Sequence, residues 1–321
     1  MMRSTLLRPG GLALLAALVA GCATAPPPAA PAAPEPAVVV AAPEPPPPPV
    51  APLAEPAPEA AEAPAPRPEP PARGRLDPLD DAARGDLWAR VRDGYAMPDL
   101  DSELVRKWEQ YYAQRPDYVQ RMTARGARYL WHIVEEIDRR NMPTDLALLP
   151  FIESAFDPQA LSVARAAGMW QFMPGTGRDF ELKQNLFRDD RRDILASTRA
   201  ALDYLQRLHG MFGDWHLALA AYNWGQGNVQ KALARNARAG QPASYEALRM
   251  PDETRNYVPK LQAIKNIVAR PEAFGLVLPP LEDHPYFTTV TIERDIDVVL
   301  AARLAGLTLE QFHQLNPQHN K

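Results

Sequence analysis

Proline is distributed so unevenly along this chain of 321 residues that only part of it can form a packed core. More than half of the 36 prolines fall between Pro26 and Pro71, among residues that are mostly Ala, Val and Glu, and no aromatic residue occurs there. Such a segment cannot bury enough apolar surface to fold. We therefore predict a disordered, extended linker over residues 22–75. About 45 residues of it, at about 3.1 Å each, could span roughly 140 Å.

A short apolar run near the N-terminus indicates export. Residues 12–20 follow two arginines and are about half as long as a membrane-spanning helix, which predicts a signal peptide over residues 1–21. The only cysteine, Cys22, follows Val19-Ala20-Gly21, and this small-residue tetrad resembles the lipobox at which bacterial lipoproteins are cleaved and lipidated. The alternative is an ordinary cleaved signal followed by an incidental cysteine.

Acylation of Cys22 would place the mature chain on a membrane. We expect at least two acyl chains, palmitate among them, because one chain binds only marginally. Ala23 stands where an Asp tends to retain lipoproteins in the inner membrane, so we expect a lipid anchor in the outer membrane, facing the periplasm. A net charge of -4, with acids and bases interleaved, gives no indication of a nucleic-acid partner.

The remaining chain has the apolar periodicity of helices. Few stretches alternate with period 2 before Tyr286, so we expect a mainly α fold, with an N-terminal helical region over residues 76–140. Beyond Tyr286 we expect a short strand at 288–292 and helices within 297–316. The helices expected before it cover approximately residues 102–115, 117–140, 144–153, 197–209, 215–223, 229–236 and 257–269.

Glu153 is an acid embedded in the apolar run of residues 146–156. Loss of hydration in such surroundings raises the pKa of a carboxyl group toward the range of a general acid. The simpler reading is a polar residue at a helix end. Asp157 lies four residues on and is a candidate for the second carboxylate of an ordinary glycosidase pair. However, Pro158 moves it out of helical geometry. Ser154 could hydrogen-bond near the carboxylate.

The run of residues 168–177 combines apolar side chains, one amide and several glycines, a mixture that suits a sugar-binding site. Gln171 can donate to and accept from hydroxyl and acetamido groups, whereas Met169, Trp170 and Met173 can line apolar walls. The alternative is a flexible loop whose aromatic side chains face the core.

A third run, residues 218–229, ends an apolar helix on a polar triplet and a glycine-containing turn. Tyr222 and Asn223 could both hydrogen-bond a ligand. In the simpler reading, Asn223 caps the helix and Tyr222 packs in the core.

Four motifs in order resemble those of the soluble-lytic-transglycosylase-like family over roughly residues 140–270. They are Glu153-Ser154, the stretch from Gly168 to Gln171, Ala221-Tyr222-Asn223, and Tyr257 within Glu253-Thr254-Arg255-Asn256-Tyr257-Val258-Pro259-Lys260. The resemblance implies a goose-lysozyme-like helical catalytic domain over residues 141–275. It also implies that Glu153 is catalytic, that Ser154 and Tyr257 orient the acid and the sugar, and that Met169, Gln171, Tyr222 and Asn223 bind or orient substrate.

The resemblance implies cleavage of peptidoglycan glycan strands between N-acetylmuramic acid (MurNAc) and N-acetylglucosamine (GlcNAc), leaving 1,6-anhydro ends. One rival is a hydrolytic muramidase, for which Asp157 and Asp179 are candidate second acids. Another is a non-catalytic wall-binding lipoprotein, although burying Glu153 has a cost that binding alone does not require. The six histidines include no HExxH pair, so we expect no metal and no cofactor.

The C-terminal residues 286–321 are similar to a LysM peptidoglycan-binding module. The stretch Leu315-Asn316-Pro317 fits that pattern, but residues 293–297 stand where the module usually has Gly-Asp-Thr-Leu, and no second strand follows. We therefore expect a degenerate or incomplete LysM-like βα element.

Overall fold

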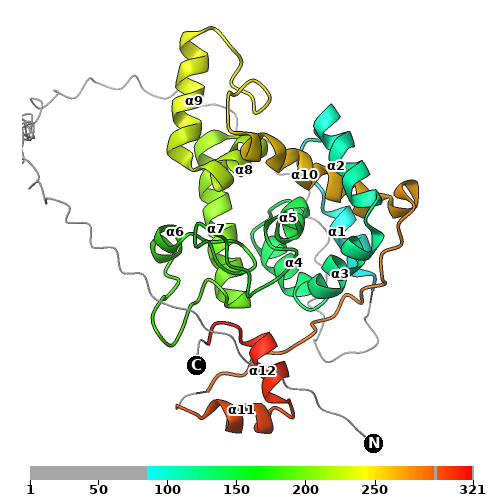
Figure 1. Ribbon diagram of the computed structural model, residues 1–321, viewed down its shortest axis with the longest axis vertical. Helices are drawn as coiled ribbons and strands as arrows, with labels where there is room; N and C mark the ends of the chain where they lie inside the picture. The colour runs from blue at the N-terminus through cyan, green and yellow to red at the C-terminus, as the bar shows by residue number, and fades with distance from the viewer. Residues whose placement is uncertain (1–84, 293–294, 320–321) are drawn as a thin grey trace, which may run out of the picture. The chain divides into compact units, whose positions relative to one another are not determined.

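The computed structural model describes residues 85–292 and 295–319 (Figure 1). Within these residues it contains helices and isolated β-bridges but no strand of a sheet, which confirms the mainly α prediction. All of them belong to one compact unit. The predicted signal peptide, Cys22 and the linker lie outside the described residues. No helix in the described part of the chain is both long and apolar enough to cross a bilayer.

Twelve α-helices and two 3₁₀ helices are described, and most coincide with segments of helical periodicity. In chain order they are α1 (Leu87–Asp93), α2 (Glu103–Ala113), α3 (Pro116–Gly126), α4 (Leu130–Arg139), η2 (Thr144–Leu148), α5 (Leu149–Glu153), α6 (Pro174–Asp179), α7 (Ile194–Phe212), α8 (Trp215–Trp224), α9 (Gln226–Arg238), α10 (Asp252–Ala269), η3 (Pro271–Phe274), α11 (Val298–Leu304) and α12 (Leu309–Leu315).

The helix expected over 117–140 is divided into α3 and α4. The break follows Gly126, which packs against the ring of Phe156, a residue that is itself fully buried. A Cβ atom on Gly126 would lie 3.2 Å from that ring, so this close approach favours glycine. Glycine also weakens a helix interior, and the two effects together explain the division.

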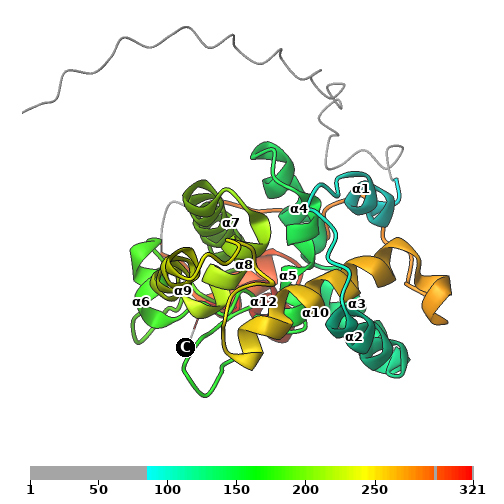
Figure 2. The same cartoon turned by 90° about the horizontal axis from the view of Figure 1, so that it is seen from above.

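The core forms around α7, α8 and α10. Helix α8 packs against α7, α9 and α10, and α10 also packs against α2 and α5 (Figures 1 and 2). Asp193 and Asp214 cap the first turns of α7 and α8 by accepting from the backbone N–H groups of Ala196 and Leu217. The side chains from His216 to Ala221 are all buried, so α8 is a central helix.

Helix α5 ends abruptly at Glu153. The next residues include Ala155 and Phe156, which adopt left-handed backbone angles with φ of 52° and 56°. The ring of Phe156 packs edge-on against Phe151, with centroids 4.6 Å apart. This buried turn fixes the direction in which the chain leaves α5, and it leaves Glu153 at the end of the helix.

The strand expected at 288–292 is wrong, because these residues have no regular secondary structure. Val290 and Ile292 are largely exposed, and no pairing partner for them is found in the described part of the chain. The expected helical part is present as α11 and α12. The end of the chain contacts the helical unit, where the N–H of Asp189 donates to the carbonyl oxygen of Gln318 at 2.9 Å.

Candidate active site

Glu153 meets Tyr257 of α10, whose hydroxyl group donates a hydrogen bond to Oε1 of the carboxyl group. Glu153 keeps partial contact with solvent, but burial by the surrounding side chains raises its pKa to about 7. The hydrogen bond from Tyr257 lowers the pKa, although not enough to offset burial. Glu153 is therefore suited to exchange a proton in both directions near neutral pH.

Two charged residues of α10 also act on Glu153. The charge of Glu253 raises the pKa of Glu153, whereas the charge of Lys260 lowers it. Together with Tyr257 they follow the spacing i, i+4 and i+7, which places them along one side of a helix. Glu253 and Lys260 lie in the fourth sequence motif but are not among the predicted site residues. Their helical phase relative to Tyr257 would have indicated them.

Ser154 links the end of α5 to the loop that carries the second motif. Its hydroxyl group donates to the carbonyl oxygen of Met169 at 2.9 Å and accepts from the N–H of Asp157 at 3.1 Å. The Met169 side chain is fully buried in the core, so only its backbone takes part in this contact. The two motifs are thus joined through one serine.

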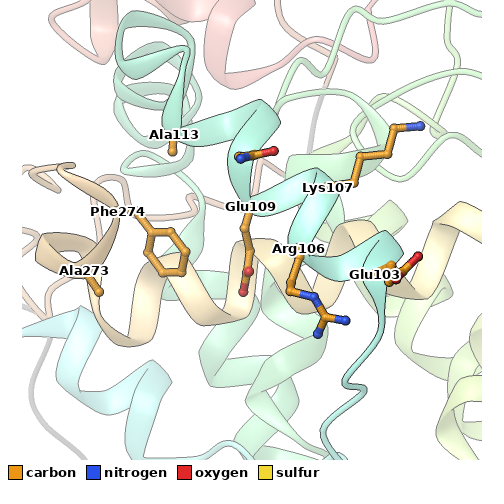
Figure 3. Close-up of a pocket in the computed structure, with 8 residues that line it drawn as sticks. Glu103, Arg106, Lys107, Glu109, Ala113, Ala273 and Phe274 are labelled. Atoms are coloured by element: carbon orange, nitrogen blue, oxygen red, sulfur yellow. The ribbon is translucent and has the colours of Figure 1, made fainter.

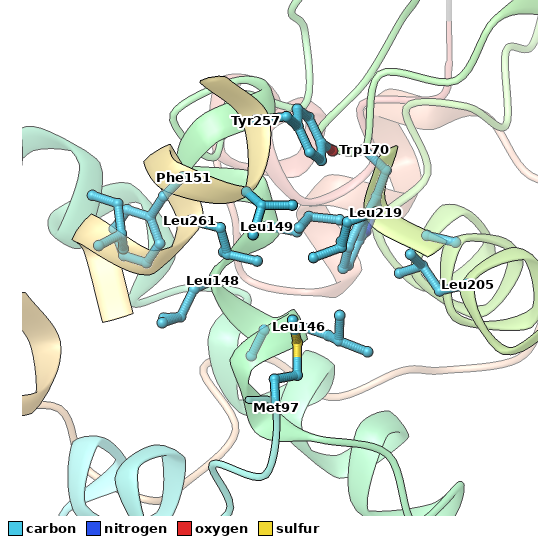
Figure 4. Packing of buried hydrophobic residues seen from close by; sticks show 14 of the residues in the cluster. Met97, Leu146, Leu148, Leu149, Phe151, Trp170, Leu205, Leu219, Tyr257 and Leu261 are labelled. Carbon is cyan, nitrogen blue, oxygen red and sulfur yellow. The ribbon is translucent and has the colours of Figure 1, made fainter. Parts of the chain in front are cut away.

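The loop of the second motif is a tight turn. Gly168 has φ of 83°, and a Cβ atom there would lie 1.8 Å from the carbonyl oxygen of Arg191, so only glycine fits. Gln171 has φ of 50°, and its amide nitrogen donates to the carbonyl oxygen of Gly168 at 2.8 Å. The expectation that Trp170 lines an apolar wall is wrong, because its side chain is fully buried and donates to Thr198 at 3.0 Å (Figure 4).

Tyr222 and Asn223 lie in the last turn of α8, and the C-terminal cap of that helix is Gly225. The Tyr222 hydroxyl donates to the carbonyl oxygen of Trp170 at 2.9 Å. Burial raises the pKa of Tyr222 well above its usual value, and the nearby charge of Glu153 adds to this effect.

Asn223 is held by the start of α10. Its Oδ1 accepts from the hydroxyl of Thr254 at 2.8 Å, and its Nδ2 donates to Glu253 at 3.4 Å. The structure therefore brings Glu153, Ser154, Tyr222 and Tyr257 together, and it connects Asn223 to them through Glu253.

The carboxyl groups of the candidate second acids make their contacts elsewhere, although the backbone N–H of Asp157 donates to Ser154. Asp157 accepts from the N–H of Gln159 at 2.9 Å, in a local turn. Asp179 ends α6, and its charge raises the pKa of Tyr204. Neither aspartate is among the groups that shift the pKa of Glu153. Among residues 85–292 and 295–319, no cluster of His, Cys, Asp or Glu side chains could hold a metal ion.

A cavity of about 570 Å³ lies between α2 and η3 (Figure 3). It is lined by Glu103, Arg106, Lys107, Glu109, Gln110, Ala113, Ala273 and Phe274. None of the predicted site residues lines it, so it is distinct from the group around Glu153.

The chain resembles known proteins over most of its described length. It is 39% identical over 246 residues to membrane-bound lytic murein transglycosylase D of Escherichia coli (strain K12), a match that covers 76% of this chain and 54% of that protein. The chain thus spans about half the length of this relative. It is also 34% identical over 192 residues to the "Putative tributyltin chloride resistance protein" of Alteromonas sp. (strain M-1), covering 59% of this chain and 89% of that protein.

A solved structure, an inactive mutant of lytic transglycosylase Slt from Pseudomonas aeruginosa, is 26% identical and covers 44% of this chain and 24% of that one, with a TM-score of 0.36. The family model described as the transglycosylase SLT domain matches residues 130–243, which include Glu153, the Gly168 turn and Tyr222-Asn223. Given this match and the relatives above, the chain belongs to the transglycosylase SLT domain family.

Proposed function

We propose that the protein is a peptidoglycan lytic transglycosylase that cleaves the β-1,4 bond between MurNAc and GlcNAc and leaves 1,6-anhydro-MurNAc ends. The observation that carries the proposal is the carboxyl group of Glu153, whose pKa is raised to about 7 and which accepts a hydrogen bond from Tyr257. Family membership and the names of the relatives support the same reaction.

In the proposed first step, protonated Glu153 donates its proton to the glycosidic oxygen while the bond from that oxygen to C1 of MurNAc breaks. GlcNAc leaves as the alcohol, and C1 becomes cation-like. The acetamido group of MurNAc supplies electron density to C1, as in substrate-assisted glycosidases. The ionised Glu153 then removes the proton of the C6 hydroxyl, whose oxygen attacks C1 and closes the anhydro ring. One carboxyl group thus acts first as the acid and then as the base.

The remaining site residues orient the acid or bind the sugar in this proposal. Tyr257 holds the Glu153 carboxyl by its hydrogen bond, and Ser154 fixes the end of α5 against the carbonyl oxygen of Met169. Gln171, Tyr222 and Asn223 bind the glycan strand. No step requires a metal or a cofactor.

A hydrolytic muramidase is the second candidate, and the observation in its favour is Glu253. Its charge acts on Glu153, so a second carboxylate is near the proposed acid after all. In that mechanism a water molecule, rather than the C6 hydroxyl, attacks C1. The two reactions differ in the chemical end that they leave on MurNAc.

We also propose the domain organisation and location expected from the sequence. Residues 1–21 form a signal peptide, and Cys22 carries a lipid that anchors the protein in the outer membrane at the end of the linker over residues 22–75. Residues 76–140 precede the catalytic domain at 141–275, and residues 286–321 form a degenerate LysM-like element. Relatives named membrane-bound support the anchor. Incorporation of labelled palmitate that is lost in Cys22→Ser tests it.

The proposed function is tested by Glu153→Gln, which keeps the size and hydrogen-bonding capacity of the side chain but removes the titratable proton. The variant should still sediment with purified peptidoglycan, because the proposed sugar-binding residues are intact, and it should release no muropeptides. Asp157→Asn is the matched control, with release close to that of the wild type. Wild-type release by Glu153→Gln would contradict the assignment.

A further inference from the structure

Lys265 of α10 is the centre of a polar network that the proposed reaction does not use. Lys265 and Asp145 are buried, whereas the side chain of Asp99 is 75% exposed. Its ammonium nitrogen lies 2.7 Å from Oδ1 of Asp145 and 2.8 Å from Oδ1 of Asp99. It also donates to the carbonyl oxygen of Met97 at 3.2 Å and lies 5.1 Å from the centroid of the Tyr95 ring. Burial lowers the pKa of Lys265, but the two carboxylates raise it overall, so the group stays charged.

Asp145 belongs to η2 and is almost fully buried. Its Oδ2 accepts from the N–H groups of Ala96 and Met97 at 2.9 and 3.3 Å. Its Oδ1 lies 2.7 Å from the ammonium nitrogen of Lys265, and no other described residue donates a hydrogen bond to it. Removing the lysine would therefore leave a buried carboxylate oxygen without compensation.

Two contacts join η2–α5 to α10, and they are separated by the same number of residues in both segments. Asp145 precedes Glu153 by eight residues, and Lys265 follows Tyr257 by eight residues. The ion pair of Asp145 with Lys265 and the hydrogen bond of Glu153 with Tyr257 therefore join the same two segments, running in opposite directions, at two points. Along the chain, buried leucines stand between the paired residues of each segment: Leu148 and Leu149 in η2–α5, and Leu261 in α10, all labelled in Figure 4.

Residues 95–100, which precede α2, complete the network. The amide of Gln262 accepts from the N–H of Leu100 at 3.1 Å and donates to Asp99 at 3.0 Å. A ring nitrogen of His216 lies 3.0 Å from the carbonyl oxygen of Pro98. This segment thus connects α8, α10 and η2, although it lies outside the family match at residues 130–243.

Buried ion pairs are weak evidence for stability, because a well-packed apolar pair often serves as well. Their best-attested use is to fix the register of two segments. The spacing of the two contacts fits that use here, since a slip of α10 along η2–α5 would separate both pairs at once.

We propose that Lys265 is a positioning residue, which with Asp145 and residues 95–100 fixes α10 along η2–α5 so that Tyr257 reaches Glu153. The expected effect on catalysis rests on the proposed function, whereas the positioning of Tyr257 against Glu153 does not. It also makes residues 95–100 part of the catalytic unit rather than of a separable N-terminal region.

The test uses the full chain in detergent and the variant Lys265→Met. The Glu153 resonance is followed by carbon-13 NMR of labelled glutamate during a pH titration, and Glu153→Gln identifies it. Loss of the Tyr257 hydrogen bond should raise the pKa of Glu153 above its wild-type value. The other groups that face Glu153 are not substituted. Glu253 and Lys260 lie on α10 and would move with Tyr257, but their charges act on the pKa of Glu153 in opposite directions, and Tyr222 lies on α8.

The kinetic readout is muropeptide release. A small displacement of a catalytic group costs about 10- to 100-fold in rate, so kcat should fall by that amount with little change in KM. Lys231→Met, on the exposed face of α9, controls for loss of a lysine. Arg90→Met controls for loss of a buried cation, because Arg90 pairs with Glu135, Asp138 and Asp283, which lie outside α5 and α10. Both controls should retain the wild-type pKa of Glu153 and the wild-type kcat.

If Lys265→Met does not fold, the neutral double variant Asp145→Asn with Lys265→Met takes its place, because it leaves no isolated buried charge. A folded variant with the wild-type pKa of Glu153 and wild-type kcat would overturn the proposal. So would the same changes in Arg90→Met, or failure of both Lys265 variants to fold, which would show a role in folding instead. If the wild type releases no muropeptides, the proposed function fails, and the NMR titration still decides the positioning role.

Discussion

The hydrogen bond from Tyr257 to Glu153 allows a quantitative prediction for Tyr257→Phe. The substitution removes one hydroxyl group and keeps the ring that packs in the core. A hydrogen bond to a charged group contributes about 1.5–3 kcal/mol. Because Glu153 keeps partial contact with solvent, we take the lower value, about 1.5 kcal/mol, which corresponds to roughly a tenfold change in proton affinity.

The direction of the change in the pKa of Glu153 depends on which state of the carboxyl group the hydrogen bond stabilises. Tyr257 donates to the ionised carboxylate and thereby lowers the pKa of Glu153, so Tyr257→Phe should raise it above about 7. The first proton transfer needs protonated Glu153, and the rate on free enzyme therefore falls as pH rises through this pKa. In Tyr257→Phe the alkaline limb of kcat/KM should move to higher pH, while kcat itself falls because the carboxyl group is less well oriented.

The assay is the pH dependence of muropeptide release, fitted for kcat and for kcat/KM. Tyr245→Phe is a matched control, because Tyr245 is buried like Tyr257. Its hydroxyl group donates to the backbone carbonyl of Thr254 and not to Glu153. The control should keep the wild-type alkaline limb. An unmoved limb in Tyr257→Phe, or the same movement in both variants, would refute the reasoning.

Three further predictions concern stability and charge. The pKa of Glu153 is raised from 4.5 to about 7, so its contribution to stability is present at low pH and lost as pH rises through 7. The loss is on the order of 2–3 kcal/mol, and Glu153→Gln should therefore unfold at a higher temperature than the wild type at pH 8 but not at pH 4. Gly168→Ala should lower the free energy of unfolding, measured with denaturant, by at least about 2 kcal/mol, because its Cβ would overlap a backbone carbonyl. Gly210→Ala, in open space on α7, should raise it by about 0.5–1 kcal/mol, and equal stabilities of the two variants would contradict this. Glu253→Gln should lower the pKa of Glu153 in an NMR titration, because it removes a like charge, and Asp157→Asn should leave that pKa unchanged.

Local periodicity was sufficient to predict most of the helices. The apolar residues of α4 recur at helical spacing, and the burial of Leu130, Ile133, Val134 and Ile137 follows from that pattern. Helix α8 is instead indicated by its run of Ala and Leu, which are strong helix formers. The division between α3 and α4 was not predicted, because it depends on the contact of Gly126 with Phe156, thirty residues further along the chain. The local pattern predicts a strand at 288–292, but a strand also needs a partner, and a local pattern does not supply one.

The acid itself was predictable from the sequence, since an isolated carboxyl group in an apolar run indicates a raised pKa. The direction of side chains in an irregular turn was not. Trp170 and Gln171 are neighbours in the chain, yet one side chain is fully buried and the other remains partly exposed, because the backbone of Gln171 turns to φ of 50°. Lys265 belongs to no recognisable sequence motif. Its proposed positioning role depends on α10, η2 and residues 95–100, which only the folded chain brings together.

The central claim is that Glu153 returns to act as a base toward the C6 hydroxyl of the same sugar that it has just cleaved. Mass spectrometry of the muropeptides released from purified peptidoglycan tests this claim most directly, with Glu153→Gln as the inactive reference. Products with 1,6-anhydro ends, lighter by one water than hydrolytic products, are the predicted result. Free reducing ends on the released MurNAc would contradict it and would identify water as the nucleophile.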